Sequence, residues 1–405
     1  MNGMGFDRIL GGVCAPLGFL AAGVSCGIKA DGRPDLALVF SKQAAFAAGV
    51  FTTNEMKAAP VLMTRSLLSS GQAQAIVLNS GCANCMTGEQ GMKDAVAMAK
   101  TAEKALGIKS GQAAVASTGH ICEHLPMDKV VAGIEQAAGE LSPGGNTDAA
   151  KAIMTTDTYP KELAAEMEIG GKIVRIGAMA KGSGMVHPNM ATMLGVITTD
   201  IELPHDMMQE WLTSAVEWSF NRISIDGDQS TNDMVLMLAN GMVFPEGHVL
   251  TANEADLFYR ALCWLTGNLA MSLVKDGEGA TKLIRIVVNG TVDDSDAVRV
   301  ARAIANSNLV KSSFNGEHVN VGRIAAAAGS AGVSLDPARF TMFLGEHKVA
   351  EGGYEVPYQA ADMASILKRD EVELTVNLGL GSGSAYFLTC DLSCDYVEFN
   401  AGERS

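Results

Sequence analysis

The chain has 405 residues, of which 48% are hydrophobic and 19% charged, so it can bury a large core in two domains or in one large one. Its formal charge of -15 argues against nucleic acid and anionic membranes as partners, because both attract basic surfaces. The acidic residues are dispersed rather than gathered in a tail, which is typical of a globular protein.

The N-terminal part contains an uncharged stretch with the composition of a membrane segment. Residues 9–28 carry no charged side chain, but Pro16 and several glycines interrupt the apolar run. We therefore expect buried strand and turn here rather than a signal peptide or a membrane span. No other stretch is expected to be long enough to span a bilayer, and the expected localisation is cytoplasmic.

Apolar runs alternate with stretches of helical periodicity, which predicts a mixed α/β organisation. Strands are expected at 36–41, 74–80, 113–118, 172–180 and 194–200. Helices are expected at 91–107, 127–141, 206–221 and 252–276. Beyond a loose boundary near residue 282 we predict a smaller subdomain, at about 282–390, that begins with a strand at 283–290 and a helix at 294–307. The segment DYVEF (395–399) is expected to be a strand.

The cysteine pattern indicates free thiols, which behave as small hydrophobic residues in a reducing compartment. Two groups leave other possibilities open: the CxxC of Cys82 and Cys85, and the run of His120, Cys122 and His124. The CxxC follows an expected strand, as a redox motif would, whereas the second group has no fourth metal ligand nearby. We expect no metal site, with redox activity and metal binding as the alternatives.

Two further motifs imitate binding sites without meeting their requirements. GLGSGS (379–384) lacks the spacing of a dinucleotide fingerprint and is expected to form a hairpin or a bulge. IDGDQSTND (225–233) resembles a calcium loop that begins at Asp226, but Thr231 stands where such a loop has glycine and Met237 where it has glutamate. It is expected to be a polar turn or a cluster of supporting hydrogen bonds.

The stretch KGSGMVHPNMATMLGVITTD (181–200) passes from a Gly/Pro-rich loop into an expected buried strand at Thr192. A β-branched threonine can simply begin a strand. Alternatively, attack of the Thr192 hydroxyl on the carbonyl of Ala191, followed by hydrolysis of the resulting ester, would free the amino group of Thr192. An amine with a pKa of about 8 can then serve as the base for its own hydroxyl. The residues alone leave both interpretations open.

Several further motifs are distributed along the chain from one end to the other. They are AAGVFTTNEMKAAPV (47–61), ASTG (116–119), IMTTDTYPK (153–161), DGDQSTND (226–233), VKDGEGATK (274–282), NSNLVK (306–311) and DYVEFNAGERS (395–405). Together with residues 181–200 they resemble the ornithine acetyltransferase (glutamate N-acetyltransferase) family of arginine biosynthesis. Members of that family cleave themselves before the threonine of an ATML signature, so the resemblance favours the nucleophile interpretation of Thr192.

The resemblance implies a role for each matching residue. Thr192 is the implied nucleophile, and Thr118 and Gly119 are the implied oxyanion hole, where a hydroxyl and an N–H stabilise a tetrahedral intermediate. Substrate contacts are implied, besides Thr192, for Thr155, Lys181, Glu278, Asn400 and Ser405. Lys181 suits a substrate carboxylate, and Glu278 suits an ammonium group or a proton relay.

The resemblance also implies a fold and an assembly. The expected fold is a layered α-β-β-α sandwich with a smaller C-terminal subdomain, cut into intertwined chains 1–191 and 192–405 that pair as a heterotetramer of two alpha and two beta chains. The implied reaction moves acetyl from N-acetylornithine to glutamate through an acetyl-threonine, with no cofactor and with acetyl-CoA as a possible second donor. An N-terminal-nucleophile amidohydrolase or aminopeptidase is the first alternative, and an uncleaved ligand- or metal-binding protein is the second.

The chain departs from the family pattern at four places. Cys82 and Cys85 replace an Asn/Ala pattern, and His120 and Cys122 stand where Val and Gly are usual. Leu20 and the segment GEHVNVGRI (316–324) also differ from the family pattern. The first two departures lie near the expected site and bear on the choice of acyl donor, whereas none changes the nucleophile.

Overall fold

The computed structural model describes residues 4–187, 193–245 and 247–402. Its larger sheet has nine strands in the order β1-β6-β7-β8-β10-β3-β4-β5, with β2 paired to β3. The strands are β1 (Phe6–Ile9), β2 (Phe19–Val24), β3 (Leu36–Phe51), β4 (Gln72–Cys82), β5 (Ala113–His120), β6 (Lys161–Ile169), β7 (Lys172–Lys181), β8 (Leu194–Thr199) and β10 (Met234–Ala239). Each of the five predicted strands in this part of the chain is present.

The large sheet is folded over along β3, so that its two halves face each other. The first part of β3 pairs with β2 and β4, its register shifts between Phe40 and Ala45, and its last residues pair with β10. Side chains from both halves share one apolar cluster, in which Val39 and Ile76 of one half join Val196 of the other. Because β-branched and small residues dominate this cluster, the two layers can pack closely.

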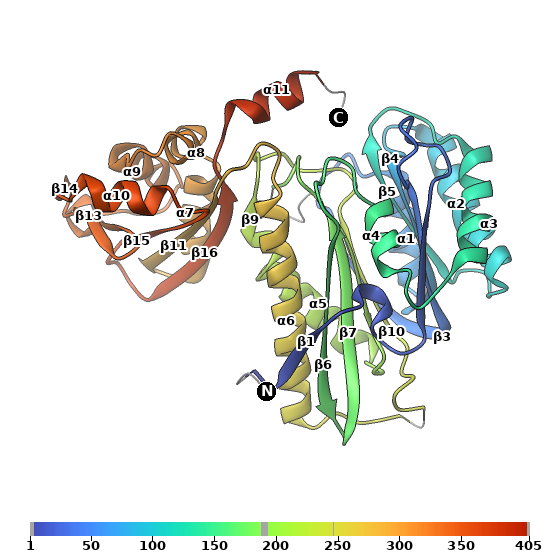
Figure 1. Cartoon of the computed structure of the whole chain (residues 1–405). Helices are drawn as coiled ribbons and strands as arrows, with labels where there is room; N and C mark the ends of the chain where they lie inside the picture. The colour runs from blue at the N-terminus through green and yellow to red at the C-terminus, as the bar shows by residue number, and fades with distance from the viewer. Residues whose placement is uncertain (1–3, 188–192, 246, 403–405) are drawn as a thin grey trace.

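Helices cover the two outer faces of the folded sheet (Figure 1). On one side, α2 (Gly88–Leu106) and α3 (Met127–Glu140) pack on the layer of β2, β3, β4 and β5. On the other side, α5 (His205–Glu217) and α6 (Ala252–Lys275) cover the layer of β6, β7 and β8. The shorter α1 (Ala59–Leu68) and α4 (Asn146–Ala152) contribute side chains to the cluster between the layers. The predicted α-β-β-α sandwich is therefore confirmed.

A second sheet is built mostly from the last third of the chain. Its order is β14-β13-β12-β15-β11-β16-β9. The strands are β9 (Ile223–Ser224), β11 (Leu283–Thr291), β12 (Thr341–Leu344), β13 (His347–Glu351), β14 (Tyr354–Glu355), β15 (Glu371–Asn377) and β16 (Gly383–Cys390), and the helices are α7 (Asp294–Ala305), α8 (Asn308–Asn315), α9 (Val321–Gly329) and α10 (Ala360–Leu367). The short β9 comes from the earlier part of the chain, so the second sheet is joined to the sandwich by pairing as well as by the connecting chain.

One prediction about the end of the chain was wrong, and one was wrong in part. DYVEF (395–399) lies in a helix, α11 (Cys394–Gly402), that has no buried residue. Its aromatic and β-branched residues favour a strand locally, but a helix satisfies its own backbone hydrogen bonds where no strand is there to pair with it. GLGSGS (379–384) is not a hairpin, because β15 and β16 lie on opposite sides of β11. The bulge alternative fits better, because the pairing of β11 with Gly383 and Ser384 shifts register between Asn289 and Thr291.

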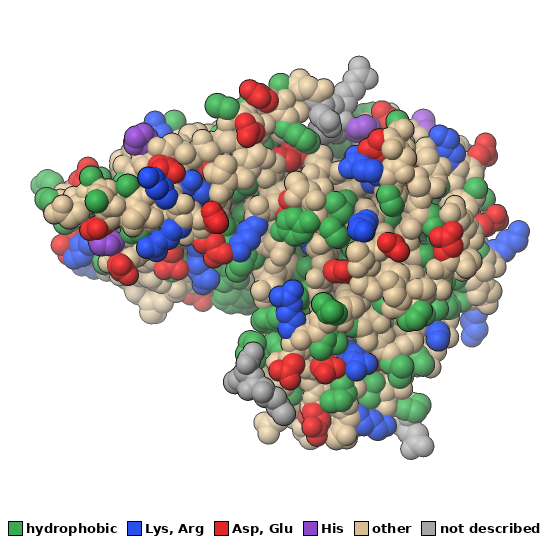
Figure 2. Space-filling view, viewed as in Figure 1, with side chains coloured by type: hydrophobic (Ala, Val, Ile, Leu, Met, Phe, Trp, Pro, Cys, Tyr) green, Lys and Arg blue, Asp and Glu red, His purple; other side chains and the backbone are tan. Residues whose placement is uncertain are grey.

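The stretch 9–28 forms strand and turn as expected, in β1, a 3-10 turn at Gly12–Cys14 and β2. The expectation that no other segment is long enough to span a bilayer was wrong, since α6 is both long and apolar enough. Half of its most apolar window is buried inside the protein, however, where it packs against the sandwich core. On the visible surface, acidic and basic side chains are interspersed (Figure 2).

Candidate active site

A pocket of about 890 Å³ opens where loops of the sandwich meet α11. It collects predicted site residues that are far apart in the sequence, namely Thr118, Gly119, Thr155, Lys181, Glu278 and Asn400. The predicted residues Ala191, Thr192 and Ser405 lie outside the described residues.

Thr118 and Gly119 lie at the end of β5, on the pocket wall. Gly119 has a φ of 126°, and a Cβ at this position would come within 2.3 Å of the carbonyl carbon of Gly81 in β4. Only glycine fits so close an approach of two backbones. The hydroxyl of Thr118 is 3.5 Å from the ammonium of Lys181, so the two side chains face the same space.

Lys181 ends β7 and is 3% exposed. Its ammonium donates a hydrogen bond of 2.8 Å to the hydroxyl of Thr155 and lies 4.0 Å from a carboxylate oxygen of Asp157. Burial lowers the pKa of Lys181, and the negative charge of Asp157 opposes that shift. The cation is thus held in a desolvated place, where a bound carboxylate would gain the most.

Lys181 belongs to a buried group of charged side chains that we call the pocket floor: Asp157, Lys161, Lys181 and Asp276. The Lys161 ammonium donates to Asp157 at 2.7 Å and to Asp276 at 2.5 Å. Burial alone would raise the pKa of Asp157, but the two lysines outweigh it and lower that pKa to about 2. Two cations and two carboxylates therefore balance one another out of contact with water.

Glu278 follows α6 and joins three parts of the pocket. Its carboxylate accepts hydrogen bonds from the hydroxyl of Thr156, at 2.7 Å, and from the side-chain amide of Asn400, at 2.9 Å. A Cβ on Gly184 would come within 2.4 Å of the same carboxylate, so the loop that follows β7 passes directly beside it. Asn400 belongs to α11, and Glu278 therefore ties this helix to the pocket.

The loop 225–233 holds the backbone that leads up to the undescribed segment 188–192. Asp226 accepts from the backbone N–H groups of Met185 and Val186, at 2.5 and 2.8 Å. Burial raises the pKa of Asp226 to about 6. This loop is thus a hydrogen-bond cluster, as the sequence predicted, and not a calcium loop.

The same loop holds the chain where it resumes after the undescribed segment. The fully buried carboxyl of Asp233 accepts from the backbone N–H of Met193 at 3.0 Å. Burial raises the pKa of Asp233 well above its usual value. Asn232 fixes the loop itself, because its amide donates to the carbonyl oxygens of Ala83 and Ser117.

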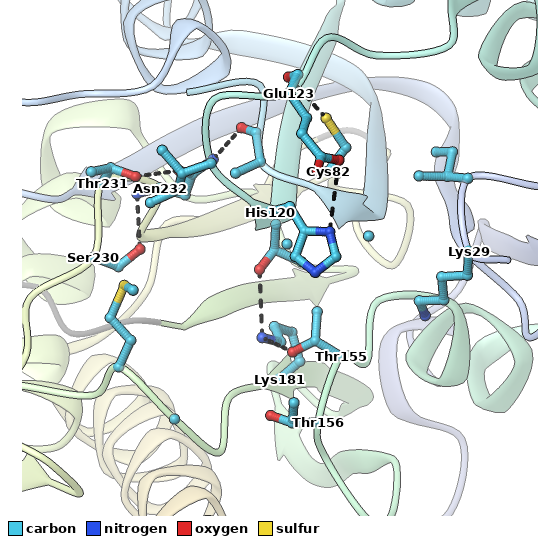
Figure 3. A pocket seen from close by; sticks show the side chains of 18 of the residues that line it. Lys29, Cys82, His120, Glu123, Thr155, Thr156, Lys181, Ser230, Thr231 and Asn232 are labelled. Atoms are coloured by element: carbon cyan, nitrogen blue, oxygen red, sulfur yellow. Dashed lines mark hydrogen bonds and ion pairs between the residues drawn. The ribbon is translucent and has the colours of Figure 1, made fainter. Parts of the chain in front are cut away.

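Three residues of the cysteine and histidine motifs line the pocket, namely Cys82, His120 and His124. Cys82 and Cys85 are buried free thiols, and burial raises the pKa of Cys82. His120 lines the pocket, with Nδ1 3.7 Å from a carboxylate oxygen of Glu123 (Figure 3). Within the described ranges, no three His, Cys, Asp or Glu side chains gather closely enough to hold a metal ion, so these residues do not support the metal-binding alternative.

Sequence reasoning missed several residues that shape this site. Asp157 and Lys161 lie within the motif IMTTDTYPK, but nothing in the sequence distinguishes them from its other residues, and only the structure shows that they pair. Thr156 was not among the predicted site residues, yet its hydroxyl contacts Glu278. Lys29 also lines the pocket, and no motif pointed to it.

Comparison with known proteins identifies the chain's family. A sequence model of the ArgJ family matches residues 20–405. The arginine biosynthesis bifunctional protein ArgJ of Symbiobacterium thermophilum is 49% identical over 401 residues, which cover 98% of this chain and 100% of that protein. The protein of the same name from Gloeobacter violaceus is 44% identical, with 98% of each chain covered.

Two solved structures match part of the chain. The ArgJ protein of Bacillus halodurans is 38% identical, covers 46% of this chain and 98% of its own, and has a TM-score of 0.44. Ornithine acetyltransferase from Mycobacterium tuberculosis, solved in complex with ornithine, is 44% identical, with 45% and 98% covered and a TM-score of 0.43. The family match and the relatives that align from end to end decide the assignment: the chain belongs to the ArgJ family of arginine-biosynthesis enzymes.

Proposed function

We propose that this enzyme transfers an acetyl group from N-acetylornithine to glutamate through an acetyl-threonine at Thr192. The observation that carries the proposal is the pocket itself, where a buried ammonium (Lys181), an oxyanion-type pair (Thr118 and Gly119) and a carboxylate (Glu278) share one space. These groups match the carboxylate, the carbonyl oxygen and the ammonium of an N-acetylated diamino acid.

The first step is self-cleavage between Ala191 and Thr192. The Thr192 hydroxyl attacks the carbonyl carbon of Ala191, the amide becomes an ester, and water hydrolyses the ester to leave chains 1–191 and 192–405. The freed amine of Thr192 then takes the proton of its own hydroxyl during catalysis. Asp226 and Asp233 support this step, because they hold the backbone on both sides of the segment that contains the bond.

Acetyl transfer then follows a ping-pong course. The Thr192 oxygen attacks the acetyl carbonyl of N-acetylornithine, the amide bond breaks, and ornithine leaves with a proton. The amine of glutamate next attacks the acetyl-threonine, which releases N-acetylglutamate and restores the hydroxyl. Thr118 and Gly119 would stabilise the oxyanion in both steps. The proposal needs no metal or organic cofactor. It admits acetyl-CoA as a second donor and includes a cytoplasmic heterotetramer of two alpha and two beta chains.

Intact-mass measurement with and without substrate tests this function. Wild type should consist of chains 1–191 and 192–405, and N-acetylornithine given without an acceptor should add one acetyl mass to the second chain. Thr192→Ala should stay whole and inactive. A wild-type chain that remains whole, or that is cut elsewhere, would refute the proposal. Release of free acetate in place of N-acetylglutamate would favour an amidohydrolase instead.

A further inference from the structure

Lys29 is a pocket cation to which the proposed reaction assigns no task. It is half-buried on the loop after β2 and lines the pocket. Its ammonium donates to two backbone carbonyls, of Pro34 at 2.8 Å and of Met154 at 2.7 Å. An ammonium has three N–H groups, so one donor is left for a ligand. Among the ion pairs of the described residues, none includes Lys29.

The side chains of Lys29 and Lys181 form hydrogen bonds with two consecutive residues, Met154 and Thr155. The carbonyl of Met154 binds Lys29, and the hydroxyl of Thr155 binds Lys181. The path from one ammonium to the other consists of these two hydrogen bonds and the short stretch of chain between the Met154 carbonyl and the Thr155 hydroxyl. The two ammonium groups are therefore on the order of 10 Å apart or less. Figure 3 shows the two lysines on either side of Thr155. A five-carbon dicarboxylate can reach cations at such a separation.

A third cation beside the same segment is less suited to this task. Arg33 donates to the carbonyl of Thr155 at 3.2 Å, but its side chain is 57% exposed and is already paired with Asp31 at 2.5 Å. Lys29 is more enclosed, and burial, followed by repulsion from Arg33, lowers its pKa to about 8. A carboxylate bound beside Lys29 would meet a cation that has lost much of its hydration.

The proposed reaction requires one pocket to accept side chains of opposite charge in turn. Ornithine ends in an ammonium, which suits Glu278, whereas glutamate ends in a carboxylate, which Glu278 would repel. Both substrates also carry an α-carboxylate, for which Lys181 is suited. The second carboxylate of glutamate therefore needs another cation, and Lys29 is the enclosed one within reach.

We infer that Lys29 binds the side-chain carboxylate of the acceptor and so selects a dicarboxylic amino acid for the second half of the reaction. The inference rests on the proposed function. Lys29 would contribute little to the first half, in which the departing side chain is cationic. The two halves of a ping-pong reaction can be measured separately, which allows a direct test.

The test compares Lys29→Met with wild type in both half-reactions, using cleaved enzyme. The rate at which labelled ornithine is exchanged into N-acetylornithine reports the first half-reaction and needs no glutamate. In Lys29→Met this rate should differ from that of wild type by about twofold or less. The kcat/KM for glutamate should fall about tenfold or more, as expected for loss of a hydrogen bond to a charged group. The preference for glutamate over uncharged glutamine as acceptor should fall with it, and Lys29→Arg should restore part of both.

Lys129→Met is the matched control, because Lys129 donates to the carbonyl of Gly27 on the same loop but does not line the pocket. Lys29→Gln retains a donor for the loop carbonyls and serves if the Met variant does not fold. An equal loss in both half-reactions, or an unchanged preference for glutamate, would overturn the inference. Absence of exchange in wild type would instead refute the proposed function, whatever Lys29 does.

Discussion

Two sets of buried aspartates hold the backbone around the proposed cleavage site, and their electrostatic surroundings are opposite. Asp157, in the pocket floor, accepts from the N–H of Gly182 and lies between two lysines, which lower its pKa to about 2. Asp226 and Asp233, in the loop 225–233, also accept backbone N–H groups, but burial raises their pKa values.

The number of hydrogen bonds does not explain this difference. Asp226 accepts three backbone N–H groups, including that of Asp228, and its pKa is still raised. Asp157 accepts two, from Thr155 and Gly182, and its pKa is lowered. The positive charges of Lys181 and Lys161, the second of which also donates a hydrogen bond to Asp157, together with the hydrogen bond from Gly182, outweigh the loss of hydration there. Lys181 also lowers the pKa of Asp233, but burial raises that pKa by more. The floor thus carries a permanent charge balance, whereas the loop carries carboxyls that can hold a proton.

The largest expected effect is at the floor. Asp157→Ala would leave Lys161 and Lys181 without a shared buried partner, which should lower the free energy of unfolding by about 3–5 kcal/mol. Urea unfolding of purified enzyme measures this loss. Asp256→Ala is the control, because Asp256 forms an exposed pair with Arg260 and its loss should change little. Equal stability of the two variants would show that the floor does not depend on its charge balance.

The pH dependence of stability should separate the loop from the floor. Because the folded pKa of Asp226 is about 6, above its unfolded value of 3.8, its contribution is fully present below pH 3.8 and is lost as the pH rises through 6. The free energy of unfolding of wild type should fall by about 1–3 kcal/mol because of this group as the pH rises from 3.8 to 6. The free energy of unfolding of Asp226→Asn should not show this fall. Denaturant unfolding of both proteins at several pH values measures the difference. Parallel pH profiles of the two proteins would contradict the assigned shift.

A neutral replacement should be tolerated in the loop and not in the floor. Asp233→Asn keeps an oxygen for the N–H of Met193 and should change the free energy of unfolding by about 1 kcal/mol or less. Asp157→Asn should cost clearly more, since it removes a charge that two lysines need. Thermal melting of both variants, with the yield of chains 1–191 and 192–405 as a second measurement, tests the contrast. A more harmful change at Asp233 would mean that its carboxyl acts in ionised form.

The smallest effect on stability is expected outside both sets of aspartates. Deletion of residues 400–405 removes the Asn400 contact with Glu278 but no buried side chain of α11, so stability should change by about 0.5 kcal/mol or less. The kcat/KM with N-acetylornithine should still fall about tenfold, because one polar contact at the substrate is lost. Unchanged kinetics would show that this part of the chain is only a terminus.

Local patterns in the sequence predicted most of the regular structure correctly. Apolar runs placed β4, β5, β7 and β8 within a few residues, and helical periodicity located α2, α3 and α6. DYVEF was the clear failure, since its residues favour a strand but only the surrounding structure decides whether a partner strand exists. The sequence could not show that β3 lies at the fold between two facing layers.

The sequence by itself determined the chemistry that can be expected at Thr192, because the reactivity of a freed threonine amine depends on bonded neighbours and on a signature within a few residues. Tertiary structure alone decided which charges surround that position. Lys29, Asp157 and Glu278 are separated by more than a hundred residues along the chain, yet they belong to one pocket or to the floor directly beneath it. Their protonation depends on burial and on the distance to other charges, and neither quantity is encoded in the spacing of residues along the chain.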